Sequence, residues 1–180
     1  MKKSELRQII REEIENLKTP YKSKYHLDLT GDVSKDDLEG KYSVDLSNTS
    51  VTSLPDNLRL RGSLDIQNTN IKSLPNGLVI GNQLFADRTP ITSLPLDLKV
   101  RSSISLSRTK ITSLPDNLKV KNYLDLQFSN LSSIPKGLKV DGDLFVNNTP
   151  LSKKYSKEEI KKMIEDKGGY VTNRIFAENV

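Results

Sequence analysis

The sequence predicts a repeat solenoid of the α+β class, built from 20-residue units with a parallel sheet on one face and helical caps at both ends. The first observation is a Leu-Pro or Ile-Pro dipeptide that returns at a constant interval, at Leu54, Leu74, Leu94, Leu114 and Ile134. The second is that apolar residues keep one phase in every unit. Such a period indicates stacked units, because a single unit of this size cannot bury its own apolar face.

The predicted core consists of apolar columns that recur at the same interval as the dipeptide. They begin at Val44, Leu46, Val51, Leu54, Leu58 and Leu60. Alternation such as Leu64-Asp65-Ile66 predicts a strand whose apolar side chains point inward. Strands stacked at this phase would form a parallel sheet along one side of the solenoid.

The residues of one unit carry a family resemblance. Residues 64–75, Leu-Asp-Ile-Gln-Asn-Thr-Asn-Ile-Lys-Ser-Leu-Pro, resemble the leucine-rich repeat, and their Ile-x-x-Leu-Pro ending resembles the short repeats of secreted bacterial effectors. The resemblance covers residues 41–151. The family has Asn where this chain has Thr69 and its equivalents, and we expect the hydroxyl to satisfy in part the backbone groups that Asn satisfies between coils. A second extended segment at Leu58-x-Leu60 would give a β-solenoid cross-section, which is the alternative geometry.

The N-terminal part of the chain predicts a helix. Residues 1–24 are predicted to form an amphipathic helix followed by a linker. The apolar face of the helix consists of Leu6, Ile9, Ile10, Ile14 and Leu17. This helix either packs over the first coil as a cap or docks on a partner. Residues 25–40 are interpreted as a degenerate first unit of a solenoid that covers residues 25–151.

Residues 152–180 predict a C-terminal cap made of a helix and strands. Ser156 and Glu159 have the spacing of a capping box, and Gly168 supplies a helix stop. The segments around Tyr170 and Phe176 are expected to pair with the last coil as an edge strand or as a hairpin.

The composition argues against an enzyme. The chain has 180 residues, no Cys and one histidine, His26, and its glycines are scattered rather than gathered in a phosphate-binding loop. The related effectors add a ubiquitin-ligase domain with a catalytic Cys, and this chain has neither that residue nor the length. A column of Asp45, Asp65 and Asp125 is interrupted and is only a weak cation signal. We therefore expect a non-enzymatic protein with no cofactor and no metal.

The origin and location of the protein are predicted from its opening residues and from the lengths of its apolar runs. No apolar run reaches the length of a signal peptide or a membrane span, so no membrane contact is expected. The opening Met-Lys-Lys-Ser-Glu-Leu-Arg-Gln-Ile-Ile-Arg-Glu-Glu-Ile resembles the N-termini of uncharacterised proteins of large tailed bacteriophages. This resemblance implies a phage-encoded protein in the cytoplasm of a bacterial host, or in the virion. The oligomeric state is left open.

The outward-facing columns predict a partner surface. Residues that interrupt their polar pattern are Phe85, Arg88, Arg108, Tyr123, Phe128 and Phe145. Aromatic and Arg side chains are enriched in binding hot spots. We therefore predict a protein–protein interaction module that binds a host protein or a virion component through its strand face. Two alternatives are a virion structural component anchored by the N-terminal helix, and an interpretation in which Phe85 and Phe145 only fill space beside Ala86 or on the caps.

A second candidate surface is basic. The cations that recur around the Leu58-x-Leu60 segment are Arg59, Arg61, Lys99, Arg101, Lys119, Lys121 and Lys139. Charges on a sheet edge prevent neighbouring solenoids from pairing, which requires no ligand. The alternative is a polyanion or nucleic-acid site. With a net charge of +5 and no strongly basic block, nucleic acid is not the expected partner.

Overall fold

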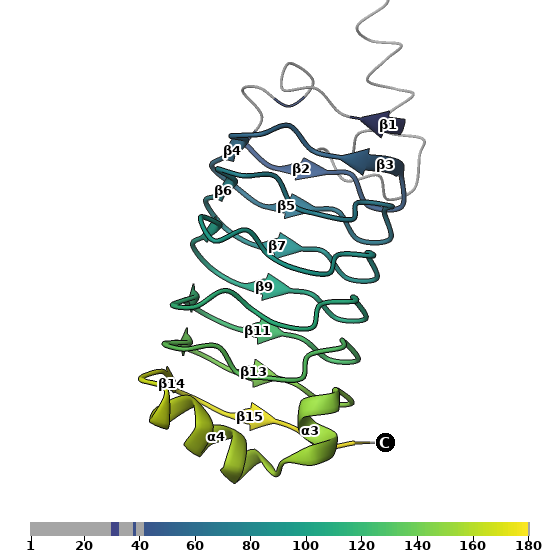
Figure 1. Cartoon of the computed structure of the whole chain (residues 1–180). Coiled ribbons are helices and arrows are strands. Elements are labelled where there is room, and N and C mark those ends of the chain that lie inside the picture. Colours follow the sequence, from purple (N-terminus) through teal and green to yellow (C-terminus); the bar gives the residue numbers. More distant parts are fainter. Residues whose placement is uncertain (1–29, 33–37, 39–41, 180) are drawn as a thin grey trace, which may run out of the picture.

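The computed structural model describes residues 30–32, 38 and 42–179, and it confirms a solenoid of stacked 20-residue coils (Figure 1). The main sheet has seven parallel strands, and neighbours pair with a shift of one repeat, so that Leu64 lies opposite Leu84. In order along the axis the strands are β2 (Val44–Asp45), β5 (Leu64–Asp65), β7 (Leu84–Phe85), β9 (Ile104–Ser105), β11 (Leu124–Asp125), β13 (Leu144–Phe145) and β15 (Ile175–Phe176).

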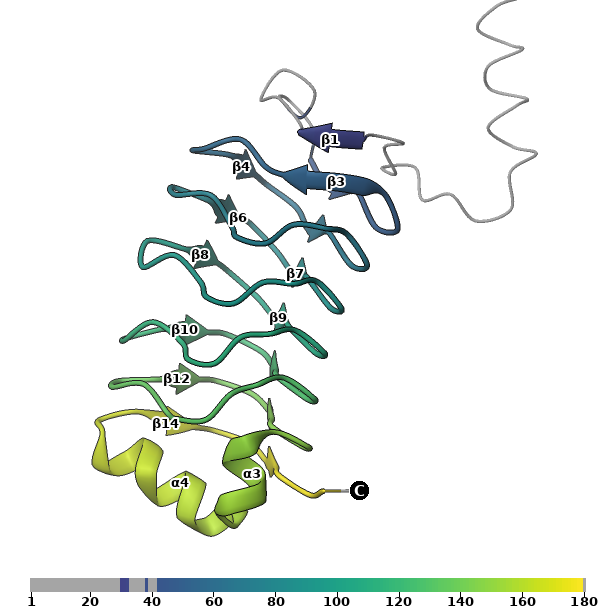
Figure 2. The same cartoon turned by 45° about the vertical axis from the view of Figure 1, so that its right-hand side comes forward.

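A second side of each coil also carries parallel strands, as in the alternative geometry. They are β4 (Arg59–Leu60), β6 (Val79–Ile80), β8 (Lys99–Val100), β10 (Lys119–Val120), β12 (Lys139–Val140) and β14 (Tyr170–Val171). We call this series the second ladder. It forms two three-stranded sheets, β4-β6-β8 and β10-β12-β14, so the cross-section is that of a β-solenoid (Figure 2).

The second ladder is interrupted between β8 and β10, and the turn before β8 has a different backbone from the equivalent turns of the other coils. At the position of Asp97 the other coils have Asn or Gly with φ between +59° and +69°, whereas Asp97 has no positive φ. Leu98, which belongs to a predicted core column, is only partly buried there, and Leu96 is 88% exposed. The column that begins at Leu58 is therefore incomplete at this coil.

The core is a continuous aliphatic column along the solenoid axis. In one coil Leu64, Ile66, Ile71, Leu78 and Ile80 are each 0% exposed. The equivalent residues of the neighbouring coils pack above and below them, so the stacking of coils removes apolar surface that one coil would leave in water.

The hydroxyl column acts within coils, and the predicted role between coils is wrong. Oγ1 of Thr69 donates to the carbonyl of Ile66 in the same coil at 2.7 Å. Thr89, Thr109 and Thr149 make the equivalent bond to the residue three positions earlier. These bonds close the turns that follow β5, β7, β9 and β13, whereas after β11 Oγ of Ser129 accepts from the N–H of Leu131.

The C-terminal end is closed by α3 (Pro150–Lys154) and α4 (Lys157–Asp166). Ser156 and Glu159 exchange both hydrogen bonds of a capping box, and the chain turns at Gly168, where φ is +75°. Ile160 and Ile164 of α4 are buried in the core. The segments β14 and β15 extend the two ladders in parallel, so they are edge strands and do not form a hairpin.

At the other end, β1 (Thr30–Asp32) pairs in parallel with β3 (Ser50–Ser53), and Leu38 is buried. The predicted N-terminal helix and most of the degenerate first unit lie outside the described residues. In the part of the chain that the structure describes, no helix is long and apolar enough to cross a membrane.

Candidate protein-binding surface

The corner after each main-sheet strand holds one residue in the left-handed backbone region. From coil to coil these residues, all with φ between +55° and +60°, are Asn48, Asn68, Arg88, Arg108, Phe128 and Asn148. Asn adopts this conformation readily, whereas for most other L-residues it costs about 1–2 kcal/mol. The central coils therefore carry Arg, Arg and Phe at positions where the backbone favours Asn. We call Arg88, Arg108 and Phe128 the corner row.

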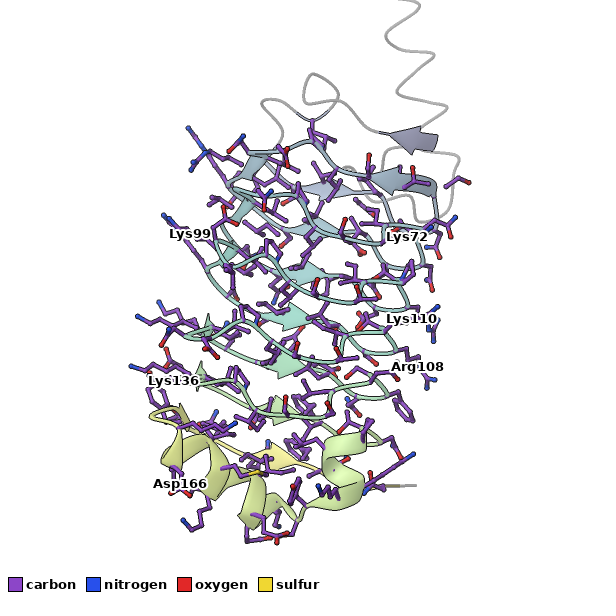
Figure 3. The ribbon with its side chains drawn as sticks, viewed as in Figure 1. Lys72, Lys99, Arg108, Lys110, Lys136 and Asp166 are labelled. Atoms are coloured by element: carbon purple, nitrogen blue, oxygen red, sulfur yellow. The ribbon has the colours of Figure 1, made fainter. Side chains whose placement is uncertain are left out.

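Backbone hydrogen bonds fix the corner row. The N–H of Arg108 donates to the carbonyl of Gln127 at 2.8 Å, and Arg88 and Phe128 make the equivalent bonds to the next coil. The guanidinium carbon of Arg108 lies 4.3 Å from the centre of the Phe128 ring, which is a cation–π contact. All three residues are exposed, and Figure 3 shows Arg108 pointing away from the coil.

An aromatic cluster of Tyr123, Phe145 and Phe176 lies at the C-terminal end of the main sheet. The rings of Phe145 and Phe176 stack at 4.6 Å with an interplanar angle of 5°, and Tyr123 meets Phe145 edge to face at 6.5 Å. The guanidinium carbon of Arg174 lies 5.0 Å from the Phe176 ring centre. Each ring is half-buried, so one part of the cluster packs on the protein and the other part faces solvent.

Carboxylates lie on the same face as the aromatic cluster, with Asp125 in register with Phe145 and Asp65 in register with Phe85. Burial raises the pKa of Asp65 above its ordinary value of 3.8, the hydrogen bonds from Gln67 partly oppose this, and the charges of Asp45 and Asp87 raise it further. The pKa of the Tyr123 phenol is also raised, first by burial and then by the charges of Asp87 and Asp125. The face is therefore electronegative where it adjoins the aromatic rings.

The second buried carboxylate of this face is Asp125. Burial raises its pKa, the hydrogen bonds from Gln127 oppose the rise, and the charge of Asp87 adds to it. Asp125 Oδ1 accepts from the backbone N–H of Gln127 at 2.9 Å, and its Oδ2 accepts from Nε2 of the same residue at 3.2 Å. Asp87 instead accepts from Oγ of Ser105 at 2.6 Å. We call Asp65, Asp87 and Asp125 the carboxylate row.

The six predicted partner residues fall into separate groups. Arg88, Arg108 and Phe128 form the corner row, while Tyr123 and Phe145 belong to the aromatic cluster. The sixth, Phe85, lies on β7 in register between Asp65 and Ser105. It is half-buried, whereas Ala86 beside it is 0% exposed and points to the core, so Phe85 does not fill the space at Ala86. Phe145 does pack on the cap, through Phe176.

Sequence reasoning missed Phe176 and Arg174 in this cluster. Phe176 pairs with Phe145 in the sheet, but the two helices of the cap are inserted between their strands, so Phe176 falls outside the phase of the repeat. The available signal was the pair Ile175-Phe176, which repeats the pattern of Leu144-Phe145. The predicted docking residues Leu6, Ile9, Ile10, Ile14 and Leu17 lie outside the described residues.

The remaining candidate sites occupy other parts of the molecule. The predicted basic residues follow the second ladder, away from the main sheet, with Arg59, Lys99 and Lys119 on its strands. Within residues 30–32, 38 and 42–179, no group of three His, Cys, Asp or Glu side chains could hold a metal ion.

The fold defines this protein as a repeat solenoid of parallel strands, an architecture that suits protein-interaction modules in general. Its main sheet offers two groups of large side chains, the corner row and the aromatic cluster, beside a carboxylate row. Comparison with protein-family models and with curated proteins gives no match for this chain.

Proposed function

We propose that this protein is a non-enzymatic interaction module that binds a protein partner through the corner row and the aromatic cluster. The observation that carries the proposal is the left-handed backbone of Arg88, Arg108 and Phe128. Backbone strain of this kind is concentrated at binding and catalytic sites, where the side chain is needed for function. Here the outer coils have Asn at the same position, so the strained residues are confined to the centre of the surface.

The chemistry of the face indicates the chemistry of the partner. Half-buried aromatic rings bury apolar area at low entropic cost, and they would receive an apolar side chain. The carboxylates of Asp65 and Asp125 are disfavoured by burial, and a Lys or Arg of the partner would offset this. We infer a partner that presents apolar and cationic side chains to the aromatic cluster and the carboxylate row.

The source of the partner follows from the opening sequence. Its resemblance to tailed-bacteriophage proteins makes a protein of a bacterial host the first candidate. A virion component is the alternative, and in that case the segment with Leu6, Ile10 and Ile14 would be the attachment element.

A pull-down from lysate of a bacterial host, read by mass spectrometry, tests the proposal. The bait is the full chain, compared with the variant Arg88→Asn/Arg108→Asn/Phe128→Asn. A matched control is Lys99→Asn/Lys136→Asn, which removes the same charge from the opposite edge of the coil (Figure 3). We expect a partner held by the full chain and the control, and lost from the triple variant.

A partner held equally by the triple variant would refute the corner-row assignment. A second comparison uses a chain without residues 1–24. Virion proteins held only by the full chain would favour the N-terminal helix as the attachment element, whereas a host protein held by both chains would favour the solenoid surface.

A further inference from the structure

The second ladder carries seven cationic side chains on one narrow strip, which we call the cationic strip. The row on the strands consists of Arg59, Lys99, Lys119 and Lys139. The second row lies two residues later and consists of Arg61, Arg101 and Lys121. Lys139 is half-buried and the others are exposed. The strip runs from β4 to β12, and the equivalent positions in the coil of β6 are Val79 and Gly81, which carry no charge.

The cations of the strip are not held in ion pairs within the described part of the chain. Lys119 and Lys139 even lie directly opposite each other in register, an arrangement of like charges that destabilises a sheet. An external anion would relieve this repulsion.

Side-to-side pairing of solenoids does not explain the strip, although β4, β8 and β10, which carry Arg59, Lys99 and Lys119, are edge strands of their sheets. The strands of the second ladder hydrogen-bond along the solenoid axis, for example from the N–H of Val79 to the carbonyl of Leu58 at 2.9 Å. Its cations therefore lie on the face of a sheet, while the edges of the sheets lie at the two ends of the ladder and at its break. The expectation that these charges keep solenoids from pairing side to side is wrong for this geometry.

The break between β8 and β10 adds a binding feature. It adjoins a shallow concavity of about 240 Å³ whose charged lining residues are Arg101, Lys119, Lys121, Lys139 and one carboxylate, Asp141. At its end Tyr170 is 41% exposed, its ring centre lies 5.8 Å from Nζ of Lys139, and its hydroxyl donates to Oδ1 of Asp141. The concavity thus combines four cations and one carboxylate with an exposed tyrosine.

We propose that the cationic strip binds single-stranded nucleic acid, with phosphates along the cation rows and a base on Tyr170. Non-specific single-strand sites combine a basic track for the backbone with an aromatic side chain for stacking. The strip is two side chains wide, which matches one extended chain rather than a duplex. This activity goes beyond the proposed function, because it uses another side of the coil from the corner row (Figures 2 and 3).

Fluorescence anisotropy with labelled 12-nucleotide single strands of DNA and RNA tests the inference on the full chain. The variant is Lys119→Ala/Lys121→Ala, and the matched control is Lys72→Ala/Lys110→Ala, which removes the same charge from the far side (Figure 3). We expect log K to fall linearly with log salt concentration, with a slope of about −0.7 for each phosphate contact. The variant should lower the magnitude of that slope by about 1.4 and the affinity at least about tenfold, while the control keeps both.

The role of Tyr170 has its own pair of variants. Replacing Tyr170→Leu removes the ring and should weaken single-strand binding about 5- to 100-fold, because stacking is sequence-tolerant but needs a π-face. Tyr170→Phe keeps the ring, loses only the hydrogen bond to Oδ1 of Asp141, and should bind like the native protein.

Three results would overturn the inference. The first is no binding of either strand at low salt, and the second is an equal loss of affinity in the variant and the Lys72/Lys110 control. The third is a tighter complex with a duplex of the same sequence, or with polyglutamate, since the strip would then serve a duplex or an acidic protein instead. None of these measurements uses the corner row, so their failure would leave the proposed protein interaction untouched.

Discussion

Arg108 and Phe128 share both a side-chain contact and a strained backbone. The guanidinium carbon lies 4.3 Å from the ring centre, and φ is +60° at Arg108 and +57° at Phe128. Asn148 in the next coil has the same φ without an aromatic or basic side chain. The pair thus places a large, rigid contact surface where the backbone favours a small amide, which is the pattern expected where stability is exchanged for binding.

Replacing Arg88 or Arg108 with Asn should stabilise the protein. Asn tolerates the left-handed region better than Arg, so Arg88→Asn should raise the free energy of unfolding by about 1 kcal/mol in urea denaturation. Arg108→Asn should raise it by less, because it also removes the cation–π contact with Phe128. The reverse change, Asn68→Arg, serves as the control and should lower it by a similar amount. A loss of stability in Arg88→Asn would show that the native side chain stabilises the corner and would contradict the strain argument.

Asp65 should contribute a pH dependence of stability. Its pKa in the folded state is raised above 3.8, mainly by burial, so the penalty on the ionised carboxyl is fully present above that raised pKa and disappears as the pH falls below 3.8. We expect Asp65→Asn to be more stable than the native protein at pH 7, with an advantage that shrinks toward pH 3.

Thermal unfolding of native and variant protein across that pH range measures the difference. The exposed carboxylate Glu165, changed to Gln, is the control and should show no comparable advantage at pH 7. An advantage of Asp65→Asn that grows toward acid pH would have the wrong sign for a raised pKa.

Two substitutions should restore the regular backbone of the turn at Leu96 and Asp97. In two other coils an Asp at the position of Leu96 accepts a bond from the next coil, as Asp116 Oδ1 does from the N–H of Lys136 at 2.9 Å. The variant Leu96→Asp/Asp97→Asn restores this acceptor and a residue that favours a positive φ. We expect the free energy of unfolding to rise by about 0.5–2 kcal/mol.

Urea denaturation checks this, and the reverse change at an intact corner, Asp116→Leu/Asn117→Asp, should lower the midpoint. If the repaired corner leaves the urea midpoint unchanged, the irregular turn is not what exposes Leu98.

The C-terminal cap should be essential for the last coils. Ile164 of α4 is 1% exposed, and Ile164→Ala should destabilise the protein by about 2–5 kcal/mol because it leaves a cavity. Ser156→Ala removes the N-cap bond and should destabilise it by about 0.5–2 kcal/mol. Hydrogen exchange should then increase first in β13 and β15; an increase spread evenly over all coils would argue against a local capping role.

Much of the fold was predictable because stacking imposes the same requirement on every coil. Columns such as those at Leu64 and Ile66 must be apolar to cover their neighbours, so the period of the apolar residues indicates which positions are buried. The capping box of Ser156 and Glu159 was predictable for a local reason, since it needs only residues three apart. The second ladder appeared only as an alternative, because two apolar residues such as Leu58 and Leu60 do not distinguish a strand from an extended turn.

The candidate surface was less accessible to sequence reasoning. The aromatic and Arg residues were found because they interrupt a polar pattern. Arg88 and Phe128 lie in strained backbone because of the geometry of the coil. Phe145 stacks on Phe176 because two helices are inserted between their strands. Neither has a local sequence signature.

The sequence by itself determined the repeat, the core columns and the position of the C-terminal cap, because these follow from periodic burial and from local hydrogen bonds. Only the tertiary structure decided which side chains share a surface. Stacking aligned the corner row, placed the cations of the second ladder on a sheet face, and brought Phe176 against Phe145 across the inserted helices of the cap. The physical reason is that each of these relationships is made between coils, and a coil's position is set only when its neighbours cover its apolar face.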